Sequence, residues 1–142
     1  MTQPTQSTFF QQKPSTLGGA IPPVPGFEDL TPETFQTNIR DTKGAYLLKV
    51  YSDRCSSCHM YSVTLTEVAE LLQGRMRMGR INRTAHPAFV ESLRVPGDPT
   101  LIFIHDGDIM GRVEGAMPIN YLRDQMPRIT KAFAERGIDI SF

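Results

Sequence analysis

The feature that most constrains the fold of this chain is a pair of cysteines placed between a strand and a helix. Cys55 and Cys58 are the only two cysteines in 142 residues. The run Ala45–Tyr51 before them is almost entirely apolar, which is typical of a central strand covered on both faces. After them, residues 62–72 carry apolar side chains at helical spacing, and Gly74 ends the pattern. The pair is therefore predicted to lie where a buried strand passes into an amphipathic helix.

That position suits a reactive thiol. The first turn of a helix has unpaired backbone N–H groups and the positive end of the helix dipole, and both favour an anion. A thiolate is the nucleophile of thiol–disulfide exchange. Cys55 is nearer the helix tip and is predicted to attack a substrate disulfide. Cys58 lies about one turn further on, on the same face, and is predicted to resolve the mixed disulfide.

Two other uses of this cysteine pair were considered. A zinc site is not expected, because there is no second cysteine pair and His59, His86 and His105 lack ligand spacing. The string Cys55-Ser56-Ser57-Cys58-His59 also matches a c-type haem attachment motif, with His59 as an axial ligand. That chemistry generally requires export, and the N-terminus has no export signal, so exchange chemistry is favoured.

The elements around the cysteine pair alternate between helix and strand. A helix is expected to begin with Thr31 as N-cap and Pro32 at the first helical position. The other expected elements are strands at 76–81, 100–104 and 109–113, a short helix at 86–93, and a terminal helix at 119–136 with a kink at Pro127. This order predicts an α/β fold in which a mixed sheet has helices on both faces.

The first part of the chain differs from the rest in composition. Residues 1–26 are rich in Gln, Thr, Ser and Pro and contain almost no charge. Such a segment buries too little apolar surface to offset its ordering entropy, so a flexible extension is expected. In the alternative interpretation, it docks on a protein partner or on its own domain. Residues 27–142 are expected to form one domain.

Charge and hydropathy exclude several partners. Lys plus Arg equals Asp plus Glu at 15 each, so neither nucleic acid nor an anionic membrane surface is expected as a partner. No run of about 18 apolar residues is present, so no membrane span is expected. The N-terminus also lacks the basic start and apolar stretch of a secretory signal, which predicts a cytoplasmic location.

A second motif strengthens the interpretation of the cysteine pair. Gly97-Asp98-Pro99-Thr100 leads into the apolar strand at 100–104. Together with the cysteine pair, this motif resembles the thioredoxin family over residues 27–137. The resemblance implies a thioredoxin fold with a sheet of four to five strands, dithiol–disulfide exchange on protein substrates, and no bound cofactor. It also implies that Pro99 is cis and lies against the cysteine pair, where neighbouring backbone binds the substrate strand.

The chain departs from the family around the site. Arg54 replaces the aromatic residue that usually precedes the first cysteine, and Asp98 replaces an apolar residue. With Pro99, these two are the expected substrate-binding residues, and their charges predict a restricted set of partners. The residues expected to modulate the thiols are Ser56 and Ser57, which replace Gly-Pro, together with His59 and Lys49. A polar rim also suits an alternative role, a non-catalytic binding module or a subunit of a larger assembly.

Lys49 stands where the family commonly has a buried acid beneath the active site. Two interpretations are open. In the structural one, its head group pairs with a nearby carboxylate or reaches water. In the functional one, its charge stabilises a thiolate, or the resolving step is slow because no anionic base is present.

Overall fold

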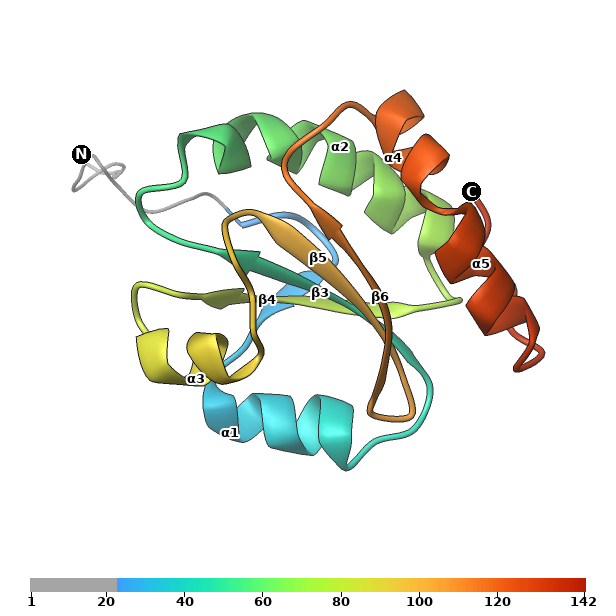
Figure 1. Cartoon of the computed structure of the whole chain (residues 1–142), viewed down its shortest axis with the longest axis horizontal. Helices are drawn as coiled ribbons and strands as arrows, with labels where there is room; N and C mark the ends of the chain where they lie inside the picture. Colours follow the sequence, from blue (N-terminus) through green and yellow to red (C-terminus); the bar gives the residue numbers. More distant parts are fainter. Residues whose placement is uncertain (1–22) are drawn as a thin grey trace, which may run out of the picture.

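The chain forms a five-stranded mixed sheet that has helices on both faces (Figure 1), and the cysteine pair follows its central strand in the chain. The structure is a computed structural model, and it describes residues 23–142. Most of the expected N-terminal extension, residues 1–22, lies outside the described residues. Within its last four residues, Val24 is only 2% exposed and packs into the core. The packed part of the chain therefore includes residues before the expected domain start at Phe27.

The sheet has the order β2-β4-β3-β5-β6. The strands are β2 (Phe27–Asp29), β3 (Ala45–Tyr51), β4 (Arg77–Asn82), β5 (Thr100–His105) and β6 (Asp108–Glu114). Strands β2, β4 and β3 are parallel, whereas β5 runs antiparallel to β3 and β6 antiparallel to β5. All seven residues of β3 are buried, as its apolar run predicts. The mixed sheet and the thioredoxin fold expected from the sequence are confirmed.

The helices form two layers. They are α1 (Pro32–Phe35), which continues as a π-helical turn at Gln36–Arg40, α2 (Ser56–Leu72), α3 (Pro87–Ser92), α4 (Ile119–Gln125) and α5 (Pro127–Ala134). Helices α2, α4 and α5 cover one face of the sheet, and α1 and α3 cover the other (Figure 1). Odd-numbered residues of β3, such as Leu47, face the α2 layer, while Leu48 and Val50 face α1 and α3.

Two helix ends show how local chemistry shaped the fold. The Thr31 cap forms as expected: its hydroxyl accepts the Thr34 backbone N–H at 3.2 Å, and the Thr34 hydroxyl accepts the Thr31 N–H at 2.8 Å. The single terminal helix expected at 119–136 is instead two helices, because α4 ends at Gln125 and Pro127 begins α5. Proline lacks the N–H that would continue the first helix, but it suits the first turn of the second.

None of the helices within residues 23–142 combines the length and the apolar character that crossing a membrane would require.

Candidate active site

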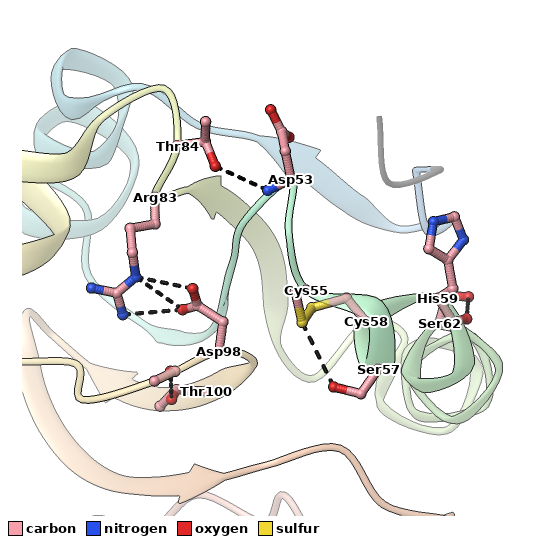
Figure 2. Close-up of a disulfide and its surroundings, with 11 residues drawn as sticks. Asp53, Cys55, Ser57, Cys58, His59, Ser62, Arg83, Thr84, Asp98 and Thr100 are labelled. Carbon is pink, nitrogen blue, oxygen red and sulfur yellow. Dashed lines mark hydrogen bonds and ion pairs between the residues drawn. A yellow bond between two sulfur atoms is a disulfide. The ribbon is translucent and has the colours of Figure 1, made fainter. Parts of the chain in front are cut away.

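The cysteine pair occupies the junction between β3 and α2. The strand ends at Tyr51, and Cys55 is the N-cap residue of α2 with an extended backbone conformation (φ −87°, ψ 91°). Its carbonyl oxygen accepts the Cys58 backbone N–H at 3.1 Å, which closes the first turn. The two Cα atoms are 5.4 Å apart, and the two sulfurs form a disulfide (Figure 2). The predicted placement at the helix tip is thus the observed one.

The two cysteine residues differ in exposure, and Cys55, which is predicted to attack, is the more exposed. Cys55 is 7% exposed and Cys58 is fully buried. The Ser57 hydroxyl oxygen lies 3.7 Å from the Cys55 sulfur, within hydrogen-bonding range of sulfur. Ser56 is exposed, and the His59 ring points away from the disulfide in Figure 2. Of the predicted modulators on α2, Ser57 is therefore the one with a contact to a reacting sulfur.

The second motif reaches the same end of the sheet through strand pairing. Thr100 at the start of β5 is paired with Val50 near the end of β3, which brings Pro99 to the level of Tyr51 and the loop before Cys55. The peptide bond between Asp98 and Pro99 is cis. Pro99 is buried, and its carbonyl oxygen accepts the Gly115 N–H at 2.9 Å. The residue that follows β6 therefore hydrogen-bonds the motif, which lies at the end of the sheet that carries the disulfide.

Asp98 is engaged by a residue that sequence reasoning did not single out. The Arg83 guanidinium donates to both carboxylate oxygens of Asp98 at 3.0–3.2 Å (Figure 2). It also donates to the Val95 carbonyl oxygen at 2.9 Å, and its own backbone N–H is bound by the Tyr51 carbonyl oxygen at 2.7 Å. Arg83 directly follows β4, and β4 lies beside β3 in the sheet. A charged residue at the end of a strand next to β3 is the sequence signal that could have identified it.

This ion pair changes the expected character of the rim. The Asp98 side chain is 11% exposed and the Arg83 side chain 27%. A bidentate arginine–carboxylate pair is close to neutral as a unit and is geometrically fixed. Arg54, in the loop before Cys55, is exposed. The predicted polar rim thus consists of a fixed ion pair beside the cis-proline and an exposed arginine next to Cys55.

Lys49 lies in the layer between the sheet and α2. In the structural interpretation, its amine pairs with a carboxylate or reaches water, and within the described part of the chain it does neither. Its side chain is fully buried, so the amine does not reach bulk water. Within residues 23–142, the Lys49 Nζ has no hydrogen-bond partner, and no carboxylate pairs with it. The amine instead lies 5.4 Å from the centre of the Tyr51 ring. Burial lowers the pKa of Lys49 to about 8, and the nearby Arg80 charge acts in the same direction.

Tyr51 lies near both this lysine and the disulfide. Its ring packs with Cys55 and Cys58 in a separate small cluster of buried side chains. A second cation, the Arg80 guanidinium, lies 4.7 Å from the ring centre and is paired with Asp29. Burial raises the pKa of the Tyr51 hydroxyl, so the ring is neutral at ordinary pH. In the described part of the chain, no group of three or more His, Cys, Asp or Glu side chains is arranged to hold a metal ion.

The fold and the disulfide define a class, the dithiol proteins built on a thioredoxin fold. Comparison with known proteins agrees with that class: the family model described as Thioredoxin matches residues 26–128. The chain belongs to the thioredoxin family.

Individual relatives are distant. A thioredoxin of Chlorobaculum thiosulfatiphilum is 24% identical over 94 residues, which are 66% of this chain and 87% of the relative. Thioredoxin Y2, chloroplastic, of Arabidopsis thaliana is 26% identical over 93 residues, 66% of this chain and 56% of the relative. Thioredoxin 1 of Nostoc sp. is 24% identical over 89 residues, which are 63% of this chain and 83% of the relative. At this distance the residues around the cysteines must be assessed from their own contacts.

Proposed function

We propose that this protein exchanges thiols and disulfides with protein substrates through Cys55 and Cys58. The observation that carries the proposal is the disulfide at the first turn of α2, with Cys55 as its more exposed residue, at the same end of the sheet as the cis-proline motif. The reaction needs only these two sulfurs, a thiol reductant and a substrate disulfide.

In the reducing direction, the Cys55 thiolate attacks one sulfur of the substrate disulfide, and the other substrate sulfur leaves as a thiolate. Cys58 then loses its proton and attacks the Cys55 sulfur of the mixed disulfide. The bond between Cys55 and the substrate breaks, the second substrate sulfur leaves as a thiolate, and the Cys55–Cys58 disulfide is restored. The substrate gains two electrons and two protons and ends as a dithiol. The helix N-terminus and the Ser57 hydroxyl stabilise the charge on Cys55.

The rim supports a narrower proposal, a restricted set of partners. Arg54 places an exposed positive charge beside the attacking cysteine, and the Arg83–Asp98 pair makes the cis-proline side polar. An apolar docking patch would accept many partners, whereas fixed charges penalise those that leave a charge unpaired. Partners with an acidic residue next to their reactive cysteine suit Arg54 best.

The test is an insulin turbidity assay with dithiothreitol, run on the wild type and on Cys55→Ser. The wild type is expected to accelerate insulin reduction, and Cys55→Ser to match the reagent blank. A matched Cys58→Ser variant is expected to accumulate mixed disulfides with partner proteins, because the resolving thiol is gone. A wild type without activity, together with a stoichiometric partner bound without any disulfide, would instead establish the binding-module alternative.

Partner selectivity is tested with a generic thioredoxin reductase. Reduction of the Cys55–Cys58 disulfide is expected to be much slower than that of an ordinary thioredoxin. Equal rates would contradict the restricted-partner proposal and leave the exchange chemistry intact.

A further inference from the structure

A row of side chains crosses the α2 face of the sheet just beneath the disulfide. Strand register places Asp29 of β2 beside Arg80 of β4, Arg80 beside Lys49 of β3, and Lys49 beside Leu101 of β5. These residues share the face that packs against α2, because they lie two positions from core residues of that layer. The row therefore places two buried cations, Lys49 and Arg80, side by side, with the exposed carboxylate of Asp29 at its end.

One of the two cations in this row has a counter-charge within the described residues and the other does not. Arg80 is paired with Asp29, whereas the Lys49 amine has no hydrogen-bond partner among residues 23–142. A fully buried ammonium without a counter-charge is costly, unless a negative charge forms nearby. The titratable or charged groups beside Lys49 are Tyr51 on its own strand and Arg80 with its partner Asp29. On α2, which covers this face of the sheet, the buried titratable groups are Cys58 and Tyr61.

Only the cysteines among these groups gain a negative charge during a redox cycle. Tyr51 lies near both, because its ring centre is 5.4 Å from the Lys49 amine and Tyr51 packs in one cluster with Cys55 and Cys58. In the oxidised protein, the sulfurs are neutral and Lys49 has no anion to pair with. In the reduced protein, a cysteine thiolate would be an anion in the cluster that contains Tyr51, next to Lys49.

We propose that Lys49 is a redox-linked positioning residue: its ammonium stabilises the thiolate of the reduced protein and so makes the Cys55–Cys58 couple more oxidising. This inference rests on the redox couple of the proposed function and deepens it. Lys49 is fully buried and does not touch the substrate, and it acts on the sulfurs through its electric field.

Reduction of the Cys55–Cys58 disulfide by glutathione transfers two electrons, and the number of protons that the protein takes up depends on the pH. Two molecules of glutathione, as thiols, supply two electrons, release two protons and become glutathione disulfide. The S–S bond between Cys55 and Cys58 breaks, Cys58 becomes a thiol by taking one proton, and Cys55 remains a thiolate. Above about pH 8, where Lys49 of the oxidised protein has lost its proton, reduction adds a second proton at the Lys49 Nζ. Below that pH, Lys49 is already an ammonium and takes up nothing.

The experiment compares the equilibrium with glutathione in the wild type, Lys49→Met and the matched control Lys43→Met. Lys43 is an exposed lysine before β3, at the end of the strand away from the disulfide. At pH 7 the equilibrium constant for reduction is expected to fall about tenfold in Lys49→Met, which corresponds to about 30 mV. The reaction of iodoacetamide with Cys55 is expected to need a higher pH. Lys43→Met is expected to match the wild type in both.

A second measurement uses the wild type and does not depend on folding of the variant. Between pH 8 and pH 9.5, the wild type is expected to take up more protons per disulfide reduced than it does at pH 7. The proposal is overturned if this extra uptake is absent, or if folded Lys49→Met keeps the wild-type constant within twofold and the same iodoacetamide profile. Glutathione equilibria need no protein substrate, so failure of the insulin assay would leave these outcomes decisive.

Discussion

Leu47 and Lys49 lie two residues apart on the same face of the same strand, and both are fully buried. Leu47 is surrounded by the apolar side chains of the α2 layer. Lys49 has an arginine beside it in the sheet, a tyrosine ring over its amine and the disulfide cluster beyond. One end of this layer therefore stabilises the fold by apolar burial. The other end holds charge where apolar packing would be more stable, which is the pattern expected of a functional site.

The largest effect on stability is expected at the apolar end. Leu47→Ala should lower the free energy of unfolding by about 2–5 kcal/mol, because a buried leucine leaves a cavity in addition to losing its transfer energy. Urea unfolding of the oxidised protein, with insulin reduction measured in the same samples, would check it. The folded fraction is expected to keep its activity per molecule. A loss of activity with no loss of stability would contradict the division between the two ends.

The pH dependence of stability should reveal the charged end. Burial holds the pKa of Lys49 at about 8 in the folded oxidised protein, below the ordinary value of 10.5 that applies when the chain is unfolded. Between those values the unfolded chain binds more protons, so stability gains a contribution from Lys49 as the pH rises from about 8 towards 10.5. The gain is at most about 3 kcal/mol.

Urea unfolding of the oxidised wild type and Lys49→Met across this pH range measures that contribution as a difference. The two curves are expected to converge as the pH rises, with Lys49→Met the more stable at pH 7. Parallel curves would show that the amine is not destabilised by its surroundings.

A smaller effect is expected at the rim. Arg83→Met removes the partner of a mostly buried carboxylate, and leaving Asp98 unpaired should cost about 1–3 kcal/mol. The double variant with Asp98→Asn removes the stranded charge and is expected to recover much of that loss. Thermal unfolding of the two single variants and the double variant forms a complete cycle. Additive effects would contradict the interpretation of Arg83 and Asp98 as one unit.

Local sequence patterns predicted much of the fold because each depends on neighbours along the chain. The apolar run Ala45–Tyr51 became the central strand, and the Thr31 cap formed its hydrogen bonds as expected. The division of the terminal helix was missed, since a proline within a helical pattern can either kink a helix or begin a new one. At the site, Cys55 and Cys58 were found directly, because their spacing alone brings them onto one helical turn.

Arg83 was not found, because a partner 15 residues from Asp98 carries no local signal. It becomes visible only when β4 is known to lie beside β3, which brings the residue after β4 to the loop that follows β3. The local sequence likewise could not distinguish the two interpretations of Lys49, because a lysine in an apolar strand can extend to solvent or stay inside.

The cysteine pair, its place between strand and helix and the Gly97-Asp98-Pro99-Thr100 motif were determined by the sequence itself, because spacing and periodicity are properties of the covalent chain. Tertiary structure decided what surrounds those sulfurs. Strand pairing placed Arg80 beside Lys49, and packing of the helical layer on the sheet left the Lys49 side chain fully buried. The charge on a side chain depends on the solvent and ions around it, and only the assembled layers determine those surroundings.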